Sequence, residues 1–94
     1  MVVIMLDKVS PSVRGYLSRW LIEPKTGVFV GKVSALVRDL LWDKLKSRIG
    51  KGSAVQIWSS NNEQGFDVRM IGERNRILVD NEGLTLVKKL KTLD

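Results

Sequence analysis

Residues 27–34, Gly-Val-Phe-Val-Gly-Lys-Val-Ser, join two different hydrophobic patterns. The apolar triplet 28–30 is β-branched and aromatic, as is typical of a strand, and its flanking glycines mark turns or a close backbone approach. From Val33 onward, apolar residues recur every four positions, which predicts a helix of four or more turns. A short strand that runs into this helix is therefore expected at the centre of the fold.

The predicted helix carries one apolar stripe that winds slowly around its axis. Its members are Val33, Val37, Leu41, Leu45 and Ile49, with Leu36 and Leu40 beside them. Because a spacing of four exceeds the 3.6 residues of a helical turn, Trp42 is expected to lie outside the helix face on which Val33 lies. Trp42 is then the tryptophan expected to contact another chain.

The N-terminal part of the chain predicts a strand and a helix. Residues 2–6 are continuously apolar, which indicates a central strand covered on both faces, and Asp7 places a carboxylate at its end. Ser10-Pro11 is typical of a helix start, with serine as N-cap, and the helix is expected to end at Pro24. Its predicted buried stripe consists of Val13, Leu17, Trp20 and Leu21.

The C-terminal half predicts further strands. Residues 54–58 and 65–71 are typical of a hairpin, and residues 77–80 of a short strand. In the second strand of the hairpin, Phe66, Val68 and Met70 are expected to face inward, and Asp67 and Arg69 to face water. Residues 84–90 fit two structures, because they alternate as a strand while Leu86, Leu90 and Leu93 would also line a helix.

The element order, β-α-β-α-β-β with a trailing strand, predicts an α+β sandwich of the ferredoxin-like class, with two helices on one side of an antiparallel sheet. A chain of 94 residues forms one small domain that is marginally stable without a partner. Its apolar strands leave sheet edges to cover, so an obligate homodimer joined through the sheets is expected.

The residue types that are missing exclude several kinds of chemistry. Without cysteine or histidine there is no disulfide framework, zinc finger or histidine-dependent nucleophile. The net charge of +6 favours nucleic acid as a partner, although basic residues also aid solubility. No apolar run reaches the roughly 18 residues of a membrane span, so a cytoplasmic protein without a membrane partner is expected.

Longer motifs follow one another in a specific order. An apolar strand with an acidic tip precedes Pro-Ser-Val-Arg-Gly-Tyr-Leu-Ser-Arg-Trp-Leu-Ile-Glu at 11–23 and the 27–34 stretch. Trp42, Trp58, Gly65-Phe66 and residues 72–80 come next, and Gly-Leu-Thr-Leu-Val closes the series at 83–87. In these motifs, over nearly its whole length, the chain resembles the type I-E branch of the CRISPR-associated Cas2 family.

The resemblance implies a homodimer of ferredoxin-like domains that bridges two integrase dimers in the prokaryotic spacer-acquisition complex. The bridge lies under a double-stranded DNA, the protospacer, and the integrase performs the strand transfer, so the bridge itself requires no cofactor. Arg14 matches a family arginine that contacts the DNA backbone, and Arg76 matches another in the loop before the short strand. Arg74 and Asn75 occupy this loop in exchanged order.

The resemblance also implies a division of the chain. Residues 1–80 correspond to the ferredoxin-like domain and residues 81–94 to a C-terminal tail that docks on the integrase. The docking segment begins at residue 78. Its apolar side chains are Leu78, Val79, Leu84, Leu86, Val87 and Leu90.

Asp7 matches the family's strand-end carboxylate, and its role leaves more than one function open. In a symmetric dimer, two copies of Asp7 could share Mg²⁺ at the axis, and relatives outside this branch are reported to be metal-dependent nucleases. The main hypothesis is therefore a non-catalytic DNA-bridging subunit. The alternative is a magnesium-dependent endonuclease that cuts RNA or DNA through Asp7. A third hypothesis, a stand-alone RNA-targeting toxin, would not need the tail.

Overall fold

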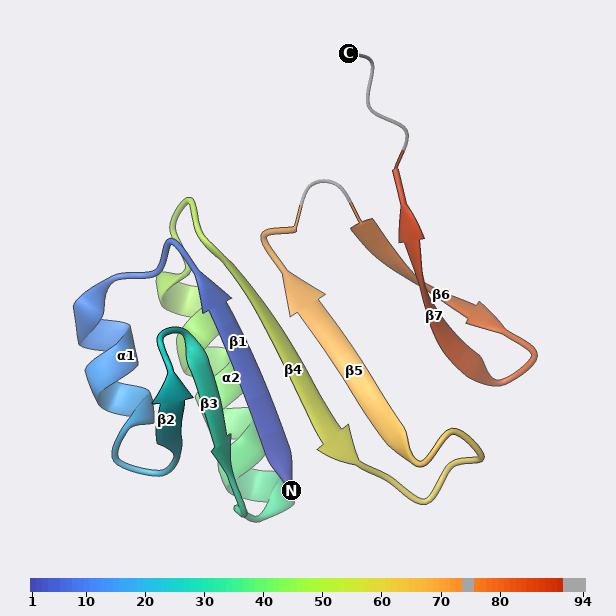
Figure 1. Cartoon of the computed structure of the whole chain (residues 1–94), viewed down its shortest axis with the longest axis horizontal. Helices are drawn as coiled ribbons and strands as arrows, with labels where there is room; N and C mark the ends of the chain where they lie inside the picture. Colours follow the sequence, from blue (N-terminus) through green and yellow to red (C-terminus); the bar gives the residue numbers. More distant parts are fainter. Residues whose placement is uncertain (74–75, 91–94) are drawn as a thin grey trace.

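The computed structural model describes residues 1–73 and 76–90 of the chain. Its elements are β1 (Val2–Asp7), α1 (Pro11–Leu17), β2 (Ile22–Lys25), β3 (Val28–Gly31), α2 (Ala35–Arg48), β4 (Ser53–Ser59), β5 (Phe66–Ile71), β6 (Arg76–Asn81) and β7 (Leu84–Lys89). The first five strands form an antiparallel sheet of order β2-β3-β1-β4-β5, and β6 pairs with β7 (Figure 1). The predicted α+β ferredoxin-like class is confirmed.

β1 is the central strand, and its two faces have different surroundings. It pairs with β3 on one side and with β4 on the other. Val2 and Ile4 are buried in the core between the sheet and the two helices, together with Phe29 and Ala54. Met5 points to the opposite face and is 38% exposed. The prediction that β1 is covered on both faces is therefore wrong for the described chain, since the helices cover only one.

α1 is shorter than the sequence predicted. It ends at Leu17, whose carbonyl accepts hydrogen bonds from the backbone N–H groups of both Trp20 and Leu21. The chain then turns into β2, where Pro24 is tolerated because β2 is an edge strand. Leu21 is buried as predicted, but Trp20 is 48% exposed, so its predicted burial is wrong.

α2 begins after Ser34, whose hydroxyl accepts a hydrogen bond from the backbone N–H of Val37 at 3.2 Å. Trp42 is only 5% exposed and belongs to the core with Leu41 and Leu45, so the prediction that it contacts another chain is wrong. Compared with the predicted apolar stripe, the buried side of α2 is shifted around the helix toward Trp42. Leu36, on the other side, is 71% exposed. Across the described residues, neither helix is long and apolar enough to cross a membrane.

A polar network joins α2 to β4 and β5. Gln56 is fully buried, and its side-chain amide donates to the carbonyl of Arg38 at 3.2 Å. Its Oε1 accepts from Nε of Arg69 at 2.6 Å, while another Arg69 nitrogen donates to Asp39 at 2.9 Å. The Arg69 guanidinium also lies over the rings of Trp42 and Trp58, at 5.0 and 4.9 Å from their centroids. Arg69 therefore faces the helix layer and not water.

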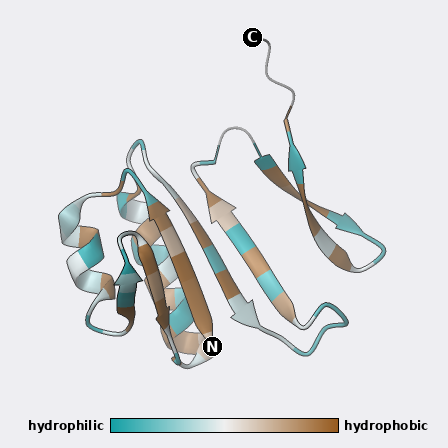
Figure 2. Ribbon diagram, in the orientation of Figure 1, coloured by the Kyte–Doolittle hydropathy of each residue, from teal (hydrophilic) through white to brown (hydrophobic). Residues whose placement is uncertain are grey.

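The direction of Arg69 fixes the opposite direction for its apolar neighbours. Because side chains alternate along a strand, Phe66, Val68 and Met70 lie on the sheet face away from the helices. The bands of brown and teal along β5 in Figure 2 follow this alternation. The prediction that these apolar residues face the core is therefore wrong. They line a groove of about 440 Å³ with Met5, Val55, Ile57, Leu78 and Val87.

β6 and β7 form a hairpin that stands beside the five-stranded sheet (Figure 1). Glu82 and Gly83 both have positive φ, 54° and 84°, as a tight two-residue turn requires. Residues 84–89 are thus a strand, which decides between the two structures predicted for them, whereas Leu93 lies outside the described residues. The hairpin spans the expected boundary between residues 80 and 81, and that boundary stays a prediction.

We predict that Gln56→Leu destabilises the fold by about 1–3 kcal/mol, because it removes the side-chain bond to the Arg38 carbonyl and leaves Nε of Arg69 without its acceptor. Urea unfolding followed by circular dichroism measures this free energy. Ser18→Ala, which removes an exposed hydrogen bond at the C-terminal end of α1, is the control and should cost under about 1 kcal/mol. Equal stability of Gln56→Leu and wild type would show that the network does not hold α2 on the sheet.

Candidate nucleic-acid interface

Four chain segments converge at one end of the sheet: the end of β1, the turn before β4, the end of β5 and the start of β6 (Figure 1). Neighbouring cavities at this end share residues. Asp7 and Lys8 line both the cavity beside Arg14 and the cavity beside Lys51. Glu73 lines the cavity beside Lys51 and also the groove that Arg76 borders. Shared lining residues therefore link the surroundings of Asp7, Arg14 and Arg76, and this linked region is here called the end surface.

Close backbone packing positions the middle of the end surface. Lys8 adopts the left-handed conformation, with φ at 56°, directly after β1. A side chain on Gly52 would clash, because its Cβ would lie 2.5 Å from the Lys8 carbonyl and 2.6 Å from the Asp7 carbonyl. Gly72 packs as closely on Gly52. This packing leaves a cavity of about 400 Å³ whose charged lining residues are Asp7, Lys8, Lys51 and Glu73.

Arg14 occupies the side of the end surface formed by α1. One nitrogen of its guanidinium donates to Oε2 of Glu23 at 2.8 Å, and the same oxygen accepts from the backbone N–H of Gly27 at 2.8 Å. The Gly27 hydrogen bond, followed by the Arg14 hydrogen bond, lowers the pKa of Glu23, so the carboxylate is ionised at neutral pH. The resemblance predicted that Arg14 contacts DNA. In this structure its guanidinium is already paired with the carboxylate of Glu23.

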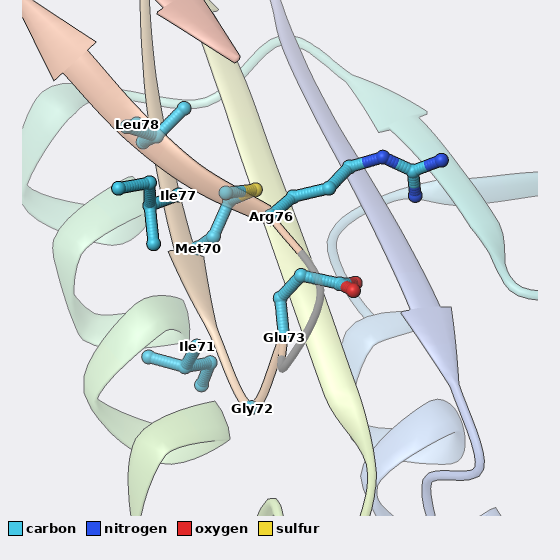
Figure 3. A pocket seen from close by; sticks show the side chains of 7 residues that line it. All are labelled: Met70, Ile71, Gly72, Glu73, Arg76, Ile77 and Leu78. Carbon is cyan, nitrogen blue, oxygen red and sulfur yellow. The ribbon is translucent and has the colours of Figure 1, made fainter. Parts of the chain in front are cut away.

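Arg76 occupies the opposite side of the end surface, at the start of β6. Its side chain extends in the same direction as the Glu73 carboxylate and away from Ile71 and Ile77 (Figure 3). It borders the groove on the open sheet face together with Met70 and Leu78. Arg74 and Asn75, the other predicted DNA contacts, lie outside the described residues.

The residues around Asp7 do not fit a magnesium site within one chain. Among residues 1–73 and 76–90, no group of three or more acidic side chains is placed to hold a metal ion. The cavity that Asp7 shares with Glu73 is also lined by Lys8 and Lys51. Two cations beside two carboxylates leave the cavity without net negative charge, which disfavours a divalent cation.

The hairpin separates the predicted integrase-docking residues onto two faces. Residues opposite each other in an antiparallel pair share a face, so Leu78 lies with Val87, and Val79 with Leu86. Leu78 and Val87 line the groove on the open sheet face, whereas Val79, Leu84 and Leu86 lie on the outer face with Ile77. Leu90 follows β7 and is 40% exposed. The sequence could not show this division, since it depends on strand register.

A family model described as CRISPR-associated protein (Cas_Cas2CT1978) matches residues 1–86 of the chain. The chain belongs to this Cas2 family. The match spans the whole five-stranded sheet, β6 and the first part of β7. Membership of the Cas2 family implies a role in CRISPR adaptation, the process by which new spacers are acquired.

The structure adds residues to the end surface that the sequence did not indicate as site residues. Lys8 and Lys51 lie between the two predicted arginines, and Glu23 pairs with Arg14. Lys8 follows Asp7 at the end of the predicted strand, and Lys51 lies between two glycines. These turn residues were the sequence feature that could have indicated both lysines. Glu23 gave no such signal, because its partner is nine residues away and contacts it only through the fold.

Proposed function

We propose that this Cas2-family protein is the non-catalytic bridging subunit of a type I-E adaptation complex. As a homodimer, it would hold a DNA duplex between two integrase dimers. The observation that carries the proposal is the end surface, on which Arg14 and Arg76 come from opposite halves of the sequence and Lys8 and Lys51 lie between them. Basic side chains gathered at one end of the protein suit the phosphate backbone of DNA, which is recognised without reading the bases.

The open sheet face supports the proposed homodimer. Met5, Val55, Ile57, Val68 and Met70 form an apolar surface with no helix over it in the described chain. An exposed apolar surface of this kind marks an interaction site, and a second copy offers an identical surface about a twofold axis. Leu78 and Val87 border the same groove from the hairpin, so they belong to the proposed dimer interface.

The outer face of the hairpin supports the proposed integrase contact. Ile77, Leu84 and Leu86 are each about 40% exposed on this face, and β7 has an unpaired edge in the described sheet. An extended segment of a partner could add to this edge while its side chains meet the apolar outer face. In this proposal the hairpin contacts the second Cas2-family copy with one face and the integrase with the other.

The alternative function, a magnesium-dependent endonuclease at Asp7, is favoured by one observation, the second carboxylate of Glu73 in the same cavity. Lys8 and Lys51 line the same cavity and offset the charge of the two carboxylates, which weakens the binding of a divalent cation. We therefore assign the end surface to DNA binding.

We predict that DNA binding is independent of sequence and steeply dependent on salt. Arg14, Arg74 and Arg76, doubled in a dimer, would contact about six phosphates, which gives a slope of log affinity against log salt of roughly −5. Arg14→Ala or Arg76→Ala should remove two contacts per dimer and flatten the slope to about −3.6. Fluorescence anisotropy with labelled duplexes of unrelated sequence measures the slope.

Arg19→Ala is the matched control for the loss of one positive charge. Arg19 lies over the Tyr16 ring, at 5.9 Å from its centroid, and is not part of the end surface. Its removal should leave the slope within about 0.5 of the wild-type value. If Arg14→Ala and Arg19→Ala flatten the slope equally, or if either end-surface variant weakens binding to only some sequences, the proposed DNA contact is wrong.

Two neighbouring substitutions on the hairpin separate the proposed partners. Val87→Asp places a charge on the groove face and should give a monomer, whereas Leu86→Asp places it on the outer face and should leave the dimer intact. Both side chains are solvent-exposed, 57% for Val87 and 43% for Leu86, so neither change buries a charge in the described chain. Light scattering measures the oligomeric state, and co-purification with the tagged integrase measures docking.

We expect Leu86→Asp to lose the integrase while remaining a dimer. A wild-type protein that is monomeric at micromolar concentration would contradict the proposed homodimer. A Leu86→Asp dimer that still retains the integrase would contradict docking on the outer face.

A further inference from the structure

The Arg14–Glu23 pair is an obstacle to the DNA contact proposed for Arg14. Glu23 stands on β2 and reaches the guanidinium with Oε2 at 2.8 Å. Arg14 keeps 36% of its side chain exposed, so a phosphate could approach the same group from solvent. A phosphate oxygen and a carboxylate oxygen compete for the same guanidinium N–H donors.

The present position of Arg14 is incompletely satisfied. Its Nε is a buried nitrogen without a hydrogen-bond partner in the described part of the chain, although arginine Nε is a donor. A buried donor without an acceptor disfavours the conformation that holds it. Rotation of Arg14 away from Glu23 would let this nitrogen reach an acceptor.

A cavity of about 310 Å³ lies beside Arg14 on the end surface. Lys8, Thr26 and the backbone of Gly27 line it together with Arg14 and Asp7. Counting Glu23, the charges around this cavity cancel, with Lys8 and Arg14 against Asp7 and Glu23. Arg14 therefore adds attraction for an anion only when its pair with Glu23 opens.

We propose that Glu23 competes with DNA phosphate for Arg14 and thereby limits the affinity of the end surface for DNA. In the free protein the guanidinium is held by Glu23. In the DNA complex it turns to a phosphodiester oxygen seated at the cavity that Lys8 and Thr26 line. This inference rests on the proposed DNA-binding function and adds a phosphate subsite and a residue that controls it.

Glu23 also has a structural role that the test must preserve. Its Oε2 accepts the backbone N–H of Gly27, which has φ at 82° and packs on the Leu6 carbonyl. Glu23→Gln removes the negative charge but keeps a side-chain carbonyl that can accept from Gly27. An unchanged circular dichroism spectrum and melting temperature would verify that the turn is intact.

The experiment measures the affinity of the full-length protein for a duplex of unrelated sequence, by anisotropy at fixed salt. Glu23→Gln should bind roughly two- to fivefold tighter for each copy of the site, the range expected from releasing an exposed ion pair. Asp43→Asn is the matched control, because it makes the same change in net charge at an exposed carboxylate 3.9 Å from Lys46. It should bind less than twofold tighter.

A second pair of variants shows whether Glu23 acts through Arg14. In an Arg14→Ala background, Glu23→Gln should have no larger effect than Asp43→Asn. Equal effects of Glu23→Gln and Asp43→Asn in the wild-type background, or an undiminished effect without Arg14, would overturn this inference alone. Absence of DNA binding by the wild type would overturn the proposed function, and this inference with it.

Discussion

The alternation of side chains along β1, β4 and β5 is the constraint on which the two large surfaces of this protein depend. Val2, Ile4 and Gln56 turn toward the helices, so Met5, Val55 and Ile57 must turn the other way. The same alternation points the Arg69 side chain toward the helix layer and the side chains of Val68 and Met70 away from it. The sheet therefore has one face under the helices and one apolar open face, and the end surface lies where β1 and β5 end.

The end surface carries both basic and acidic side chains. The Lys8 backbone packs closely on Gly52, which follows Lys51, and both lysines line a cavity with Asp7 and Glu73. Arg14 is balanced by Glu23 in the same way. Such balanced pairs keep individual phosphate contacts modest, and a dimer sums many of them. This arrangement would suit the proposed subunit, which positions DNA and does not cut it.

The sequence predicted the class of fold and the central strand–helix unit, because these follow from hydrophobic period and turn residues. It misplaced Arg69, since a charged residue that alternates with apolar ones is normally exposed, and only the register that sets Gln56 opposite Arg69 shows otherwise. The predicted exposure of Trp42 was wrong, because an apolar stripe that winds around a helix does not show which side of the helix packs on the sheet. Arg14 and Arg76 came from family resemblance, whereas Lys8 and Glu23 required the fold, which brings distant segments together.

The central claim is that this Cas2-family protein bridges DNA without cutting it, and Asp7 is the residue that tests it. The most direct measurement is spacer acquisition in cells that supply the integrase and a repeat array, with wild type, Asp7→Ala and the double variant Arg14→Ala/Arg76→Ala. We expect Asp7→Ala to acquire spacers at nearly the wild-type rate and the double arginine variant to lose acquisition. Collapse of acquisition in an Asp7→Ala protein that still forms the dimer and binds the integrase would contradict the claim and make Asp7 catalytic.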